Sequence, residues 1–146
     1  MRELPRQLTV DELAELFEGR TVLVERLAEI DHPLERADEV IAGLTFEEKL
    51  EALDAHPAIG QNAGLSAWSA VEQGSDDDPD VLAELERLNR AYEEQLGFRF
   101  VVFVDRRPRH DIVSVLRERL TRDRGEELET GLHELVAIAA DRWRRG

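Results

Sequence analysis

The sequence predicts a single all-α domain, a multi-helix bundle with one short extended apolar segment. Apolar residues recur at helical spacing along most of the 146 residues. Two segments carry the Thr-x-x-Glu pattern of a helix capping box, beginning at Thr9 and at Thr45. The one strand-like run, residues 100–104, is too short and isolated to define a sheet. No repeat or long linker divides the chain, so we expect one domain over residues 1–146.

The part of the chain before Pro57 is predicted to form four helices. The capping boxes pair Thr9 with Glu12 and Thr45 with Glu48, and each opens a helix. Pro57 disfavours the helical conformation at the residue before it, so the fourth helix should end near residue 55. We expect these helices to span about residues 9–17, 21–30, 33–44 and 45–55.

The second half is predicted to continue as helices after a glycine-containing loop over residues 60–64. Residues 66–73 fit a short helix, and an acidic connector follows it. Asp78 can cap the next helix, Pro79 suits its first turn, and Gly97 ends it. Two further helices are expected at about residues 108–120 and 125–143.

The composition excludes several classes of function. The chain has no cysteine, so disulfides, thiolate catalysis and cysteine-based zinc sites are ruled out, and a cytoplasmic location is expected. A net charge of −14 disfavours nucleic-acid binding. The short basic clusters at residues 106–109 and 142–145 are expected to be solvated surface. No apolar run approaches the roughly 20 residues that span a bilayer, and the N-terminus lacks a signal-peptide core.

His56 is the strongest candidate for proton transfer. Histidine titrates close to neutral pH and is the usual proton shuttle. A lone histidine at a helix end is more often structural. Pro57 fixes the local chain direction, however, and Gly60 permits a ligand to approach closely. The residue types alone leave both interpretations open.

Ser69, Glu72 and Gln73 share one face of the predicted helix over residues 66–73, because positions three and four apart lie together. They offer a hydroxyl, a carboxylate and an amide, a set that can orient a histidine and hold a polar heterocycle. The alternative, which spacing alone favours, is a polar stripe that faces solvent.

Other catalytic and cofactor patterns are incomplete or absent. His133 and Glu134 begin like an HExxH zinc motif, but Ala137 occupies the place of the second histidine. His110 and His32 have no further ligands at a recognisable metal spacing. Phosphate-binding glycine loops and the G-x-S-x-G elbow do not occur in the sequence. We therefore expect no metal and no nucleotide.

The chain resembles the OHCU decarboxylase family, whose name abbreviates 2-oxo-4-hydroxy-4-carboxy-5-ureidoimidazoline decarboxylase, an activity of urate breakdown. The resemblance covers nearly the whole chain, and several ordered motifs are more specific than any one alone. The motifs are His56–Pro57 with Ile59–Gly60, Trp68–Ser69 with Glu72–Gln73, Leu88–Asn89 with Tyr92, and Gly97–Phe98 before residues 100–104.

The resemblance implies an all-α enzyme, usually a homodimer, that acts on a small ureidoimidazoline without any cofactor, nucleic acid or membrane partner. It implies that His56 is the catalytic acid/base and that Glu72 is the carboxylate that holds its imidazole. The implied substrate-binding residues are Pro57, Ser69 and Gln73, together with Phe100, Val101, Val102, Phe103 and Val104 through the backbone around them.

The implied reaction suits a protein without a cofactor. The departing carboxylate is attached to a carbon next to a ring C=N bond, so the substrate carries its own electron sink. The same carbon bears a hydroxyl that loses its proton as the carbonyl of allantoin forms. The neighbouring carbon gains a proton on one face, which sets the S configuration, and a positioned histidine can assist these transfers. An apolar lining would favour release of the carboxylate as CO2.

This chain departs from the family pattern just after the apolar segment. Many members carry a basic residue where Asp105 stands, and Arg106 follows it. Either Arg106 binds the substrate carboxylate instead, or activity is impaired. Ala58 also replaces a residue that is often charged. The acidic surface would have to be offset near the site by helix dipoles or by Arg99 and Arg106.

Two other functions stay open at this point. The chain could be a non-catalytic helical binding domain on the same scaffold, or a decarboxylase of a related ureide. The presence of both His56 and Glu72 favours an enzyme, whereas Asp105 weakly favours the binding domain.

Overall fold

The computed structural model describes residues 2–57 and 78–146, and within these ranges the only regular elements are helices. The prediction of an all-α protein is therefore confirmed. The predicted helix over residues 66–73, with Ser69, Glu72 and Gln73, lies outside the described residues. In the part of the chain that the structure covers, no helix has the length and apolarity needed to cross a membrane.

The N-terminal half contains α1 (Val10–Phe17), α2 (Val22–Leu27), α3 (Ala37–Ala42) and α4 (Phe46–Asp54). Both predicted capping boxes are present. The Thr9 hydroxyl accepts a hydrogen bond from the Glu12 N–H at 3.1 Å, and the Thr9 N–H donates to the Glu12 carboxylate at 3.0 Å. Thr45 and Glu48 exchange the same two bonds at 3.2 and 2.8 Å. These local bonds explain why the sequence located α1 and α4 well.

The third helix begins later than predicted, at Ala37 rather than Pro33. Residues 33–35 form a turn instead, and Arg36, with φ of −106° and ψ of 14°, precedes the first helical residue. His32, just before this turn, has a left-handed backbone with φ of 53°. Its N–H donates to the Arg6 carbonyl at 2.6 Å, so the N-terminal segment holds this turn in place. The second helix is also shorter than predicted and ends at Leu27.

The C-terminal half contains α6 (Pro79–Leu96), α7 (Arg109–Arg119) and α8 (Arg124–Arg145). The Asp78 side chain accepts from the Asp80 N–H at 2.9 Å and so caps α6, as predicted. Gly97 ends α6 with φ of 83°, a conformation that suits glycine. Residues 100–104 are extended but form no strand, which agrees with the expected buried segment.

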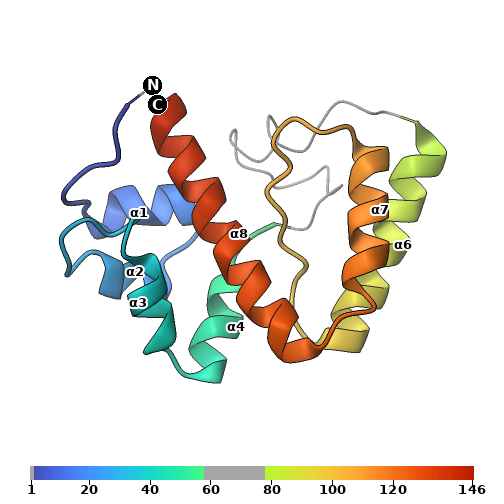
Figure 1. Ribbon diagram of the computed structural model, residues 1–146, viewed down its shortest axis with the longest axis horizontal. Coiled ribbons are helices and arrows are strands. Elements are labelled where there is room, and N and C mark those ends of the chain that lie inside the picture. The colour runs from blue at the N-terminus through green and yellow to red at the C-terminus, as the bar shows by residue number, and fades with distance from the viewer. Residues whose placement is uncertain (1, 58–77) are drawn as a thin grey trace.

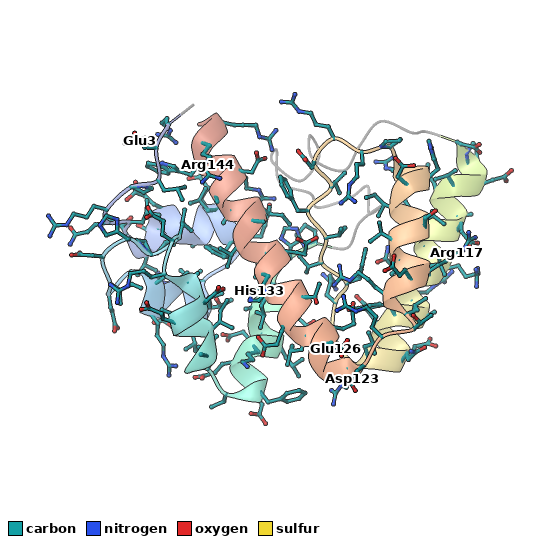
Figure 2. The ribbon with its side chains drawn as sticks, viewed as in Figure 1. Glu3, Arg117, Asp123, Glu126, His133 and Arg144 are labelled. Carbon is teal, nitrogen blue, oxygen red and sulfur yellow. The ribbon has the colours of Figure 1, made fainter. Side chains whose placement is uncertain are left out.

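Helix α8 passes through the middle of the molecule (Figure 1), with α1–α4 on one side and the α6–α7 pair on the other. α1, α3 and α4 pack on α8, while α6 packs along α7. The two chain ends meet, because the Arg2 N–H donates to the Arg144 carbonyl at 3.2 Å. Charged side chains such as Arg117, Asp123 and Glu126 project from the outer faces of the helices (Figure 2).

A buried polar cluster joins the α6–α7 pair to α8. The Glu127 carboxylate of α8, with no exposed surface, accepts from the Tyr92 hydroxyl and from Arg119 Nε, each at 2.7 Å. Arg119 Nη1 also donates to the Val101 carbonyl at 2.7 Å, and its guanidinium lies 4.6 Å from the centre of the Phe100 ring. We call Tyr92, Arg119 and Glu127 the Arg119 cluster; it fixes the start of the extended segment against three helices.

Candidate active site

His56 lies just beyond the end of α4, where the sequence placed it. Its N–H donates to the Leu53 carbonyl at 3.1 Å, and Pro57 then directs the chain away from the helix. Its carbonyl accepts from Arg99 Nη1 at 2.6 Å. The histidine therefore sits at a helix terminus that is tied to the segment following α6.

Arg99 is itself held in place on both sides. Its backbone N–H donates to the Asp54 carboxylate at 3.1 Å, and its Nε pairs with Glu93 at 2.9 Å. These bonds bring the C-terminal ends of α4 and α6 together around His56. The guanidinium is partly buried, so its charge is felt more strongly at the imidazole than a solvated charge would be.

Arg142 of α8 is the second cation at this site, and its side chain has no exposed surface. Its Nη1 donates to the Leu16 carbonyl at 2.8 Å and lies 3.1 Å from the Glu18 carboxylate. The arginine thus reaches from α8 to the C-terminal end of α1. A buried guanidinium needs such partners, because an unpaired charge in the interior is strongly destabilising.

These surroundings keep the His56 imidazole neutral. Burial, followed by the positive charge of Arg142, lowers the pKa of His56 from 6.5 to about 4. Glu18 acts in the opposite direction, and Arg99 lowers the pKa a little further. His56 Nδ1 is shielded from solvent and has no hydrogen-bond partner among the described residues. The imidazole is therefore unprotonated at neutral pH, and a bound anion would offset the arginine charges that disfavour its protonation.

Residues 100–104, the predicted apolar lining, have most of their side chains buried in the protein interior. Phe100 is buried and packs edge-on against Tyr92, with ring centres 5.2 Å apart. Val101, Val102 and Val104 are also buried, while Phe103 is partly exposed. The predicted part of these side chains in lining a substrate site stays a prediction.

Several main-chain groups of residues 100–104 have partners within the protein. The Phe103 N–H donates to Glu134 of α8 at 3.3 Å. Arg107 donates to the Phe103 carbonyl at 2.6 Å and to the Val104 carbonyl at 3.0 Å. The predicted role of these groups in binding substrate stays a prediction, and the structure shows that internal bonds already orient them.

Arg106 lies on an exposed turn rather than in the interior. Asp105 and Arg106 both have left-handed backbones, with φ of 49° and 62°. It is the next residue, Arg107, that folds back onto the extended segment. Arg99 and Arg142, not Arg106, are the arginines whose charge acts on His56.

The structure describes Pro57, which is partly buried beside His56, but not Ser69, Glu72 or Gln73. Their predicted approach to the imidazole therefore remains a prediction. The described ranges hold no group of three or more potential metal ligands from histidine, aspartate and glutamate. His133 pairs with Asp38 at 3.3 Å, which gives this residue of the incomplete zinc motif a surface role.

Sequence reasoning missed Arg142 and Glu18. The cluster at residues 142–145 was expected to be solvated surface, yet Arg142 is completely buried. A signal was present, because Leu135, Ile138 and Ala139 lie on the same helical face as Arg142. An arginine that continues an apolar stripe indicates a buried charge with a specific partner.

Fold and site together define a small helical protein in which a shielded, neutral histidine is under the charges of the buried Arg142 and the partly buried Arg99. A sequence model of the family described as OHCU decarboxylase matches residues 2–144. The chain belongs to the OHCU decarboxylase family, as its motifs suggested.

Individual relatives agree with this assignment. A 2-oxo-4-hydroxy-4-carboxy-5-ureidoimidazoline decarboxylase of Haloferax volcanii is 29% identical over 142 residues, covering 89% of this chain and 83% of the relative. A protein of the same name from Halalkalicoccus jeotgali is 26% identical over 150 residues, covering 96% and 85%. The crystal structure of an OHCU decarboxylase in the presence of (S)-allantoin has a TM-score of 0.74 at 20% identity, covering 92% of this chain and 96% of that one. This match to a crystal structure shows that the two proteins share a fold.

Proposed function

We propose that this protein catalyses the cofactor-independent decarboxylation of 2-oxo-4-hydroxy-4-carboxy-5-ureidoimidazoline to (S)-allantoin in urate degradation. The observation that carries the proposal is the neutral His56 imidazole next to two arginines, in a chain of this family. The relatives from Haloferax volcanii and Halalkalicoccus jeotgali support the substrate, because their names specify it.

His56 is the proposed acid/base. A pKa of about 4 leaves the imidazole unprotonated at neutral pH, ready to accept the hydroxyl proton as the new carbonyl forms. The C–CO2 bond breaks with its electron pair staying on the ring, where the adjacent C=N bond takes it up. A proton is then delivered to one face of the neighbouring carbon, and the overall reaction consumes one proton per CO2 released.

An acidic protein repels an anionic substrate, and the two arginines near His56 would offset this repulsion locally. Arg142 and Arg99 place two positive charges near the imidazole, within a chain of net charge −14. In a partly buried site these charges act at closer range, and with less screening, than the acidic surface. We propose that they attract the substrate carboxylate, with Arg106 as a more exposed contributor.

The remaining substrate contacts are proposals from the family pattern. Glu72 would hold the imidazole, and Ser69 and Gln73 would bind the ureido and ring amides. Pro57 and the extended segment 100–104 would supply the apolar wall, which the burial of Val101 and Val104 supports. We also propose that the protein is a homodimer in the cytoplasm, which light scattering and cell fractionation would test.

The experiment is to supply freshly generated substrate and follow the circular dichroism of the chiral product. We expect acceleration over spontaneous decay, and a loss of at least about 100-fold in His56→Ala, because general acid–base catalysis supplies about that much. His133→Ala, at an exposed histidine on α8, is the matched control and should keep its rate. No acceleration by the wild-type protein, or an undiminished rate in His56→Ala, would contradict the proposal.

A further inference from the structure

Glu18 occupies an unusual backbone conformation at the end of α1. Its φ and ψ are 65° and 20°, in the left-handed region that residues with a side chain rarely adopt. Its N–H and that of Gly19 both donate to the Ala14 carbonyl, so this is a helix-ending turn in which glycine is the usual residue. A glutamate at such a position costs free energy, which contacts of its side chain must offset.

That side chain is directed into the protein and is only 12% exposed. Its Oε1 lies 3.1 Å from Arg142 Nη1, the nitrogen that also donates to the Leu16 carbonyl. A guanidinium is planar and rigid, so two acceptors on one nitrogen restrict how the whole group can rotate. α1 lies against α8 (Figure 1), and the pair of Glu18 with Arg142 is a link between them.

We propose that Glu18 is a positioning residue of the active site, whose carboxylate holds the Arg142 guanidinium in its working orientation and balances the positive charge around His56. The inference rests on the proposed function, since it concerns how the same site is set up. The strained backbone at the end of α1 would then serve catalysis by placing the Glu18 carboxylate against Arg142.

The charges around the imidazole support this role. Three charged groups act on His56 from different elements: Glu18 at the end of α1, Arg142 on α8 and Arg99 after α6. Both arginines lower the pKa of His56, and Glu18 is the one that raises it. Loss of the Glu18 charge should therefore lower this pKa further and make the imidazole a weaker base.

The test compares three substitutions at one position. Glu18→Gly suits the left-handed backbone and removes the carboxylate, so it separates backbone strain from side-chain function. Glu18→Gln keeps an oxygen acceptor but removes the charge. Glu18→Asp restores a carboxylate and is tolerated in this backbone region. Glu15→Gln, at an exposed glutamate of the same helix, is the matched control.

For each variant we would measure kcat and KM, the melting temperature, and the titration of the His56 imidazole by NMR, assigned with His56→Ala. We expect kcat/KM to fall about 10-fold or more in Glu18→Gly, because small misplacements of site residues are costly, and to recover in part in Glu18→Asp. The His56 titration should move to lower pH in Glu18→Gln. Glu15→Gln should match the wild type in every measurement.

Wild-type kcat, KM and His56 titration in folded Glu18→Gly would overturn the inference while leaving the proposed function intact. If Glu18→Gly fails to fold, Glu18→Gln and Glu18→Asp decide: an unshifted titration in the first, or no advantage of the second over the first in kcat/KM, overturns it. A wild-type protein that does not accelerate the reaction would contradict the proposed function itself and would be evident before any variant is compared.

Discussion

Two buried arginines, Arg119 and Arg142, are each paired with a glutamate, but their surroundings differ. Arg119 is bound by Glu127, the Val101 carbonyl and the Phe100 ring, all parts of the packed interior. Arg142 is bound by Glu18 and a carbonyl of α1, and its charge also acts on His56. Burial of a charged pair therefore does not by itself indicate function. The two regions differ because, among the described residues, only the Arg142 region includes a histidine with a shielded ring nitrogen, His56.

Helix α8 contributes to both regions, with Glu127 in its first turn and Arg142 in its last. One end holds the α6–α7 pair through the Arg119 cluster, and the other reaches the end of α1. The same helix thus contributes to the packed interior at one end and to the candidate active site at the other. Substitutions at the two ends should consequently change different properties.

The largest expected effect is on stability, at the Arg119 cluster. Glu127→Ala leaves Arg119 buried without its carboxylate and removes the partner of the Tyr92 hydroxyl. We expect the free energy of unfolding in urea to fall by about 3–5 kcal/mol, as for other broken buried pairs. The exposed neighbour Glu126→Ala should change it by less than about 0.5 kcal/mol. A loss below about 1 kcal/mol in Glu127→Ala would show that the cluster is not essential to the fold.

The next prediction distinguishes Arg142 from Arg119 by the effect of each on kcat/KM. Lysine keeps the charge but not the planar fork of arginine. We expect Arg142→Lys to lower kcat/KM by about 10-fold or more, because a group in the site loses its orientation. Arg119→Lys should lower stability but leave kcat/KM within about threefold while the protein is folded. Equal losses of activity in both variants would remove the distinction between the two regions.

The third effect uses pH, since only one region contains a histidine. His56 has a pKa of about 4 in the folded protein and 6.5 as the ordinary value, so the unfolded chain binds the proton first as pH falls. The associated stability is present above pH 6.5 and is lost progressively toward pH 4, amounting to at most about 3 kcal/mol. The free energies of unfolding of wild type and His56→Gln should diverge across this window. Parallel pH dependences would contradict the lowered pKa.

The smallest effect is that of salt, which acts on the surface and spares both buried pairs. Raising NaCl from about 0.05 to about 0.5 M shortens the range of repulsion in a chain of charge −14. We expect the melting temperature to rise by a few degrees. Arg122, whose side chain is more exposed, also lies 3.2 Å from the Glu127 carboxylate. In an Arg122→Ala background, the destabilisation caused by Glu127→Ala should be the same at both salt concentrations, because Arg119 and Glu127 are shielded from solvent. A salt-sensitive difference would show that water reaches the cluster.

The sequence predicted the features that depend on neighbours along the chain. The capping boxes at Thr9 and Thr45, the end of α4 before Pro57 and the end of α6 at Gly97 all follow from bonds or steric limits within a few residues. The predicted start of α3 was wrong, because residues 33–35 form a turn instead, and the His32 N–H just before it is bound by the carbonyl of the distant Arg6.

By itself, the sequence determined that the protein is helical, which family it belongs to, and that His56 is the candidate proton shuttle. These conclusions follow from the spacing of residues along the chain and from short motifs. Only the tertiary structure decided which charges surround that histidine. Arg142 was expected at the surface, and its partners Leu16 and Glu18 lie at the other end of the chain. The packing of α1 against α8 buries the guanidinium, and no pattern of nearby residues specifies that contact.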